Sequence, residues 1–467
     1  MSTIAHRATV PDLASSLRAP DPALGEDSAD RAIPLYVWTF LAALFFNMFS
    51  GNAWLLHLPM SLDRPLFLGT LVLLLLDPYR ERWRWRWVYL AGFLTVLVTC
   101  WAWWSTGAIS DTYKAYMLID RIIMPLVMFA TGPMVFSTRA RRILLLKFFG
   151  VLTVYWGITA IGEIAHLPIV FPSFISNPDV GIGYGRARGP FLASEPMGMA
   201  CALGFFMGGL LASQTKGRWR TLGYWAMGLG FIGDALAMTR TLWIALLAGA
   251  LVIGVLVPQL RRRMPVIIGA SVAGTALALV AIPGLLPMLV ERLTTSRSIY
   301  DRVLTNEAAL KIITAKPFTG VGWGNFVGVN VDWVRQGDTI PLTTVTIEVH
   351  NVFLSRAAET GIQGAVLWGL CVLLGPVAVL LSRSPNAEAR AWKLVSIGAL
   401  FVWLLPSVGS PNPYPFPNNM IWLVCGVASR HLLIAPALRV PETDPPETDP
   451  AVEPAEDIAR LETQEAS

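Results

Sequence analysis

A histidine occurs where a polar segment of the chain changes into a long apolar one. The segment EVHNVFLSRAAETGIQG, residues 348–364, contains His350, one of five histidines, followed by Asn351. An imidazole, whose ordinary pKa is about 6.5, can accept a proton at neutral pH. His350 is therefore a candidate general base. The structural alternative is a histidine that caps the following helix or bonds to the loop above it.

Arginines are the second group of residues with a chemical use. They occur in three separated segments, GYGRARGPF, AMTRTLW and ERLTTSRSIYDRV: Arg186, Arg188, Arg240, Arg292, Arg297 and Arg302. A guanidinium matches the oxygens of a phosphate group, and near hydrocarbon it is costly without a partner. If the three segments meet at one membrane face, they predict a site for a lipid phosphate. In the alternative, each arginine is an interfacial anchor or pairs with a nearby carboxylate, such as Asp120, Asp234, Glu195 or Glu291.

The rest of the chain must hold these residues in a membrane. The 467 residues are 54% hydrophobic and only 14% charged, with 18 tryptophans, which is outside the usual balance of soluble globular proteins. Apolar stretches of roughly 17–25 residues recur along the chain, as about 30 Å of hydrocarbon requires of helices. We expect an all-α polytopic membrane protein with about twelve helices: 35–56, 65–77, 87–105, 117–136, 143–166, 191–212, 221–238, 241–258, 265–288, 352–382, 392–408 and 419–436.

Positive charges give these helices an orientation. Arginine and lysine collect in alternate loops, which is typical of cytoplasmic loops: 80–86, 139–147, 216–220, 261–263 and 383–393. Both termini are then cytoplasmic, and the loops 167–190 and 289–350 face outward. The alternative is a count that differs by two, for instance if the second and third helices form a hairpin that does not span.

This orientation divides the chain into five regions. We expect a disordered cytoplasmic tail without a cleavable signal peptide at 1–34, membrane helices at 35–288, an outer loop domain of short helices at 289–350, further membrane helices at 351–436, and a cytoplasmic tail at 437–467. The last region contains PETDPPETDP and is too poor in apolar residues to fold.

Several other kinds of site are not indicated. The four cysteines lie in apolar runs without CxxC spacing, which predicts neither disulfides nor zinc. No outward Asp-x-Asp or His/carboxylate cluster suits Mg²⁺ or Mn²⁺, so we expect no metal and no cofactor. GVGWGNF does not fit the GxGxxG pattern of nucleotide sites, and we expect Gly320, Gly322 and Gly324 to form a tight turn. The net charge of +5 is spread over the loops, which argues against nucleic acid as a partner.

Four segments, in this order, resemble the O-antigen ligase and O-antigen polymerase family of bacterial membrane glycosyltransferases: RGPFLASEPMGMACALG, TRTLWIALLAG, DRVLTNEAALKIITAKPFTGVGWGNF and HNVFLSRAAETGIQG. The resemblance extends over about 186–370, and its last two segments are the most specific. It implies an inverting, metal-independent enzyme with a GT-C-like fold. Such an enzyme transfers a glycan from undecaprenyl diphosphate to lipid A core or to a growing polysaccharide, on the outer face of the bacterial inner membrane.

The resemblance also assigns roles. Arg188, Arg240 and Arg302 match the outer-face arginines of the family, and His350 matches the histidine of its H-N motif. We expect His350 and Arg302 to be catalytic. The candidate diphosphate ligands are Arg186, Arg188, Arg240 and Arg302. Two further residues, Asn351 and Gly322, are candidates for a supporting role.

One departure and one alternative function remain. Where many members carry Asn-Pro-Asn, this chain has Ser194, Glu195 and Pro196, so any role of those amides in binding the substrate is open. The motifs do not distinguish a ligase from a polymerase. A multi-helix transporter or flippase for a lipid-linked glycan is the other candidate, although the sequence shows no internal symmetry between its halves.

Overall fold

The computed structural model describes residues 33–435 except 58–60, 108–110, 168, 259, most of 263–296, 330–331 and 334–346. The described residues form helices and no β-strand. One isolated antiparallel bridge joins Trp83 to Ile434. The predicted all-α class is confirmed.

The helices, with the bounds that the structure gives them, are these: α2 Leu35–Asn47, α3 Asp63–Leu76, α4 Trp87–Trp104, α5 Thr112–Leu118, α6 Met124–Val135, α7 Arg139–Ile164, α8 Ser194–Gln214, α9 Gly217–Leu236, α10 Arg240–Leu256, α13 Arg297–Ala315, α14 Phe326–Val329, α15 Val352–Leu374, α16 Ala378–Leu381, α17 Ala387–Gly409, α18 Pro415–Ala428 and α19 Arg430–Leu433. A π-helical turn, Ile119–Ile123, joins α5 to α6. Short 3₁₀ turns occur at Ala53–Leu56, Ser173–Ser176 and Gly189–Phe191.

Each predicted helix other than 265–288 overlaps a helix in the structure, and 265–288 lies mostly outside the described residues. The largest boundary error is at 35–56, because α2 ends at Asn47 and the 3₁₀ turn Ala53–Leu56 follows. A left-handed residue, His57, ends that turn.

Among the described residues, 6 helical segments are long and apolar enough to cross a membrane: Trp87–Trp104, Thr112–Val135, Arg139–Ile164, Ser194–Gln214, Val352–Leu381 and Ala387–Gly409. Two shorter apolar helices, Leu35–Asn47 and Arg240–Leu256, accompany them. The protein is therefore a helical membrane protein, and the count of twelve spans stays a prediction.

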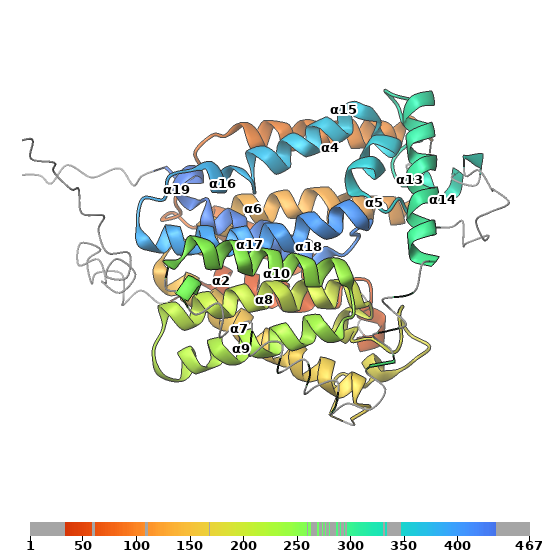
Figure 1. The fold of residues 1–467 in the computed structure, drawn as a ribbon. Coiled ribbons are helices and arrows are strands. Elements are labelled where there is room, and N and C mark those ends of the chain that lie inside the picture. The colour runs from red at the N-terminus through yellow and green to blue at the C-terminus, as the bar shows by residue number, and fades with distance from the viewer. Residues whose placement is uncertain are drawn as a thin grey trace, which may run out of the picture. The chain divides into compact units, whose positions relative to one another are not determined.

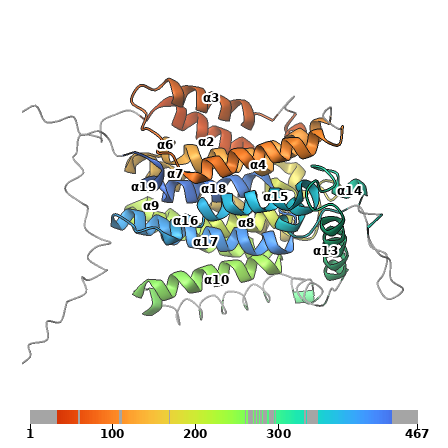
Figure 2. The same cartoon turned by 90° about the horizontal axis from the view of Figure 1, so that it is seen from above.

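The helices lie side by side, and α8 is central to them (Figure 1). It contacts α7, α9 and α17, while α18 packs on α6 and α15 on α4. Small residues allow the α8–α9 contact to be close: a Cβ at Gly230 would be 2.7 Å from the Cys201 carbonyl oxygen. Figure 2 shows the same helices from above.

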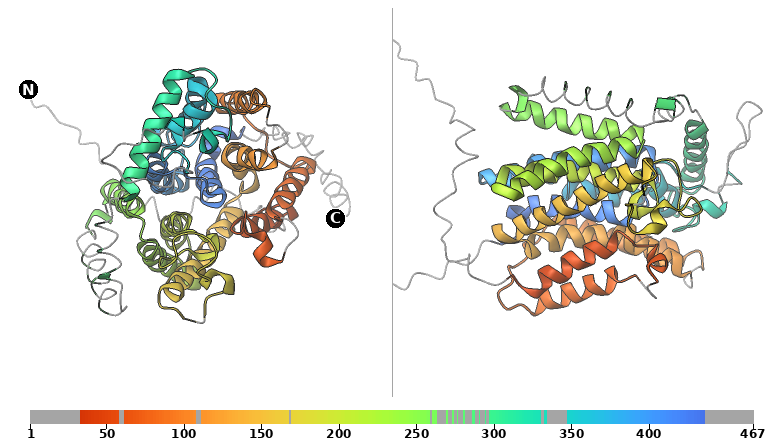
Figure 3. Two further views of the ribbon diagram at one scale, coloured as in Figure 1. Left: turned by 90° about the vertical axis from the view of Figure 1, so that its right-hand side faces the viewer. Right: turned by 90° about the horizontal axis from the view of Figure 1, so that it is seen from below.

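Helix α13 has a different direction from the others. It lies across one end of the neighbouring helices (Figures 1 and 3) and contacts α15. Its apolar side, with Ala308, Ala309 and Ile312, belongs to a small core that also includes Phe326 and Ala358. This packing fixes α13 above the starts of the membrane helices, where the predicted site residues occur.

Candidate functional site

A cluster of polar side chains forms around Glu195 at the start of α8. Its Oε2 atom accepts a hydrogen bond of 2.8 Å from the Ser410 hydroxyl, and its Oε1 atom is buried without a partner among the described residues. Arg186, Arg302 and Tyr414 are its other electrostatic and hydrogen-bonding neighbours. Three segments that are far apart in the sequence, residues 186–195, the segment at Arg302 and residues 410–414, therefore meet at this carboxylate.

Arg302 extends from α13 into this cluster. Its Nη1 atom lies 3.9 Å from the point that a Cβ on Gly409 would occupy, and Thr241 lies 3.7 Å from the same point. The Nε atom of Arg302 is buried and has no hydrogen-bond partner among the described residues. Arg302 thus lies between the end of α17 and the start of α10, with donor capacity left over.

Arg240 is the first residue of α10 and is half-buried. Its neighbour Thr241 lies beside Arg302 at Gly409, so the start of α10 belongs to the same cluster. The structure therefore brings Arg186, Arg302 and the first turn of α10 to one end of the helices. The common site for a lipid phosphate that the arginine segments predicted stays a prediction.

Arg188 has a different environment. It is 0% exposed, and its Nε donates to Glu163 Oε1 at 2.9 Å. Its Nη1 and Nη2 atoms donate to the carbonyl oxygens of Val180, Ile175 and Asn177 at 2.6–3.1 Å. A diphosphate could reach this guanidinium only if these bonds broke, so the geometry does not support the predicted diphosphate contact by Arg188.

The loop around Arg188 depends on this bonding. Glu163, in the last turn of α7, also accepts the backbone N–H groups of Arg188 and Gly189 at 2.8 and 3.0 Å. Arg188 therefore ties residues 175–189 to the end of α7. Tyr184 adds a ring 5.1 Å from the guanidinium carbon.

His350 lies in a segment that is fixed on both sides. Asn351 is the N-cap of α15, and its Oδ1 accepts the N–H groups of Phe353 and Leu354 at 2.9 and 3.1 Å. Before the histidine, Glu348 binds both terminal nitrogens of Arg121 at 2.8 Å. The cap is thus Asn351 rather than His350, and the half-buried imidazole is held between the cap and an ion pair.

Two further charges lie buried below this segment on α15. Arg356 and Glu359 are each 4% exposed, and Arg356 stacks over the Trp323 ring at 4.8 Å. Arg121 and Glu348 are their electrostatic neighbours. This network of two arginines and two carboxylates supports the base of the loop that carries His350.

The glycine-rich loop and α15 are joined through their backbones. Gly361 breaks the helix with φ 78° and ψ 171°, which frees carbonyl oxygens in the preceding turn. Two of these accept from the loop: Ala358 from the Val321 N–H at 2.9 Å, and Glu359 from the Gly322 N–H at 3.0 Å. The predicted turn is confirmed by positive φ angles at Gly320, Gly322 and Gly324. Gly322 is therefore bonded to α15 through its backbone N–H.

Tyr414 connects the two parts of the site. Burial raises the pKa of its phenol far above the ordinary range, and Glu195 and Glu348 act in the same direction. Arg186 and Arg121 are its cationic neighbours. The hydroxyl is therefore protonated at neutral pH and can donate to the Glu195 carboxylate.

The sequence did not point to several of these residues. Glu163 is a carboxylate in an apolar helix, which is a signal of function or pairing, but its partner 25 residues later was not indicated. Ser410 and Tyr414 occur in a short loop without a motif. Among the residues that the structure describes, no group of three or more His, Cys, Asp or Glu side chains could hold a metal ion, and metal independence stays a prediction.

Comparison with known proteins adds the family. Residues 225–369 match the family model described as O-antigen ligase. The matched segment contains Arg240, Arg302, Gly322, His350 and Asn351, whereas Arg186 and Arg188 precede it. No curated protein matches the chain. The resemblance to the O-antigen ligase and polymerase family is thus confirmed over residues 225–369.

Proposed function

We propose that the protein is a membrane glycosyltransferase of the O-antigen ligase and polymerase type. It transfers a glycan from undecaprenyl diphosphate to lipid A core or to a growing polysaccharide. The observation that carries this proposal is the cluster at Glu195, where Arg302 has an unpartnered buried donor beside the start of α10. Arg302 and the start of α10 both belong to the stretch that matches the family model.

The arginines of the cluster have a specific use in this reaction. When the bond between the sugar carbon and the diphosphate oxygen breaks, negative charge grows on the leaving diphosphate. Fixed cations that face this charge lower the barrier. Arg302, Arg240 and Arg186 are the proposed ligands, and together they supply the charge that a metal ion supplies elsewhere.

Arg188 has a positioning role in this proposal. Its bonds to Glu163 and to the carbonyl oxygens of residues 175–180 hold the loop. Arg186 is two residues away on the same loop, beside Gly183. We assign Arg188 to the support of Arg186, in place of a direct contact with the donor.

His350 is the proposed base. The acceptor hydroxyl attacks the sugar carbon opposite the leaving diphosphate, which inverts the configuration, and its proton passes to the imidazole. The Asn351 cap and the Arg121–Glu348 ion pair hold the segment in place. Such fixed geometry is what a base needs to meet its proton.

Orientation completes the proposal. The site lies at the ends of α8, α10 and α15 that the charge rule places outside the cytoplasm. The enzyme then acts on the outer face of the bacterial inner membrane, with about twelve spans and both termini inside. The donor lipid lies between helices, and the acceptor approaches from the aqueous side past α13.

The test is a reconstituted reaction. Purified protein is incubated, in the presence of EDTA, with an undecaprenyl-diphosphate-linked oligosaccharide, alone and with lipid A core, and the products are resolved by mass. A ladder from the donor alone identifies a polymerase, and a single transfer that requires core identifies a ligase. Absence of both products with retained donor binding would overturn the proposal and favour a flippase. His350→Ala is expected to keep donor binding and lose transfer; equal loss of both would contradict the role as base.

A further inference from the structure

A cavity of about 290 Å³ lies at the opposite end of α7 from the candidate site. Arg141, in the first turn of α7, lines it, whereas Glu163 in the last turn holds Arg188. A separation of 22 residues at 1.5 Å each places these two positions roughly 33 Å apart. The cavity is thus independent of the proposed glycosyl transfer.

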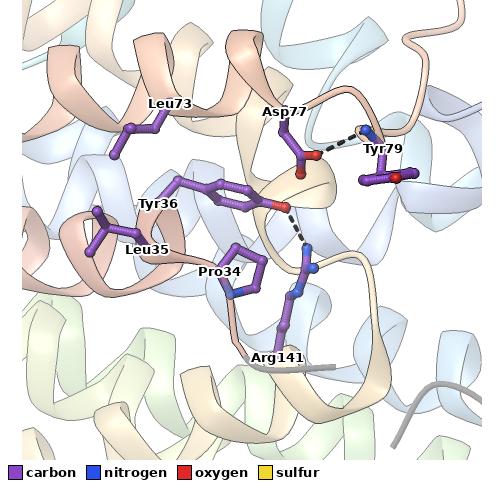
Figure 4. Close-up of a pocket in the computed structure, with 7 residues that line it drawn as sticks. All are labelled: Pro34, Leu35, Tyr36, Leu73, Asp77, Tyr79 and Arg141. Atoms are coloured by element: carbon purple, nitrogen blue, oxygen red, sulfur yellow. Dashed lines mark hydrogen bonds between the residues drawn. The ribbon is translucent and has the colours of Figure 1, made fainter. Parts of the chain in front are cut away.

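The cavity walls combine two opposite charges with apolar side chains. Figure 4 shows Arg141 and Asp77 on two sides of the Tyr36 hydroxyl, with Leu35 and Leu73 beside the ring. Tyr36 accepts a hydrogen bond of 2.8 Å from Arg141 Nη1. Asp77 Oδ1 accepts the Tyr79 N–H at 2.9 Å.

Neither charge is neutralised by an ion partner. Among the described residues, no ion pair involves Arg141 or Asp77. The two face the same space across one hydroxyl group without pairing to each other. A ligand complementary to this arrangement has an anionic group and a cationic group joined by a short linker.

The surroundings indicate the rest of the ligand. Helix α3 ends at Leu76 beside Asp77, and it exposes Leu68, Val72 and Leu76 by 63%, 47% and 73%. These residues are four apart and therefore follow one face of the helix. An apolar stripe that leads to a charged cavity at a helix end suits a molecule with acyl chains and a polar head.

We propose that this cavity binds the headgroup of a zwitterionic phospholipid that has a primary ammonium group. The phosphate accepts from Arg141, and the ammonium donates to Asp77. The glycerol region packs against Leu35 and Leu73, with acyl chains along the exposed face of α3. A quaternary ammonium has no N–H to donate to Asp77, and an anionic lipid has no cation to offer it.

The experiment measures lipid binding to the purified, delipidated full-length protein by native mass spectrometry. The probes are phosphatidylethanolamine, phosphatidylcholine, phosphatidylglycerol and soluble phosphoethanolamine. We expect phosphatidylethanolamine to bind at least about tenfold more tightly than each of the others, because hydrogen bonds to charged groups add roughly 1.5–3 kcal/mol. Equal binding of phosphatidylglycerol, or equal binding of the soluble headgroup, would overturn the proposal.

Variants separate the two charges. Arg141→Gln and Asp77→Asn are each expected to weaken phosphatidylethanolamine binding about tenfold and to bring it near the phosphatidylcholine value. Asp77→Asn keeps an oxygen for the Tyr79 N–H, so it tests charge without loss of the local fold. Arg139→Gln is the matched control, because Arg139 is exposed on the same turn and does not line the cavity. Unchanged binding in both cavity variants would contradict the site.

Discussion

The loop at Arg188 and the cluster at Arg302 use the same side chain in opposite ways. Arg188 is completely buried and donates to one carboxylate and three carbonyl oxygens. Arg302 has a buried Nε atom without a hydrogen-bond partner among the described residues, and it is an electrostatic neighbour of the Glu195 carboxylate. A guanidinium whose bonds are complete stabilises the fold, whereas one with bonds to spare is available to a ligand. The difference separates support from binding among arginines that the motifs place in one class.

The largest expected effect concerns stability at Arg188. Arg188→Ala leaves Glu163 buried without its ion partner, so the free energy of unfolding is expected to fall by about 3–5 kcal/mol. Thermal unfolding of the purified protein in detergent measures this. Arg220→Ala is the control, because Arg220 lies over the exposed Tyr224 ring and donates from Nε to its hydroxyl at 3.3 Å, with no carboxylate as ion-pair partner among the described residues. A fully stable Arg188→Ala protein would remove the distinction between the two arginines.

Arg302→Ala should affect the reaction and spare the fold. We expect transfer to slow by about 10²–10³-fold, the usual loss on removal of one transition-state donor. Stability should change little, since the Nε atom already lacks a partner. Transfer rate and unfolding temperature are measured on the same preparation, with Lys311→Ala on the exposed side of α13 as control. An unchanged transfer rate would exclude Arg302 from the site.

Gly361→Ala tests the joint between the loop and α15. A Cβ there would be 2.4 Å from the Phe318 carbonyl oxygen, and φ is +78°. The expected cost is about 1–3 kcal/mol, with partial loss of transfer because the loop that packs beneath His350 shifts. Gly369→Ala in the same helix is the control, since nothing lies within 4 Å of its Cβ position. Equal effects of the two substitutions would show that the contact between the glycine-rich loop and α15 at Gly361 has no specific role.

Glu195→Gln gives the smallest expected change and the most specific one. The amide can still accept from Ser410, but the negative charge beside the proposed diphosphate is gone. Donor binding is expected to tighten about fivefold, because a like charge at this range costs roughly 1 kcal/mol. Equilibrium binding of the lipid-linked donor measures this, with Glu307→Gln on the exposed face of α13 as control. Weaker binding would mean that the carboxylate mainly holds the arginines in place.

The sequence predicted the described helices because helix formation in a membrane protein depends on the local apolar length. The orientation that the charge bias gives these helices stays a prediction. The end of α2 at Asn47 was missed because apolar residues, Ala53–Leu56, continue beyond the polar turn Ser50-Gly51-Asn52. Apolar composition does not predict where an α-helix gives way to a 3₁₀ turn.

The candidate site was only partly predictable. Positive φ at Gly320, Gly322 and Gly324 follows from the residue type, but the partner of the turn is the kink at Gly361, some forty residues later. The Glu163–Arg188 pair and the Arg121–Glu348 pair each join a helical turn to a loop that is distant in the sequence, and nothing in either local segment identifies the other member. Arg188 was therefore grouped with Arg302 on type and position, although its bonds give it another role.

The most direct measurement is donor binding and unfolding temperature, determined together for Arg302→Ala and Arg188→Ala. We predict that Arg302→Ala loses binding of the undecaprenyl-diphosphate-linked glycan at an unchanged unfolding temperature. Arg188→Ala should show the larger drop in unfolding temperature. If Arg188→Ala instead keeps its stability and loses donor binding, while Arg302→Ala binds normally, the assignment of support and binding among these arginines is contradicted.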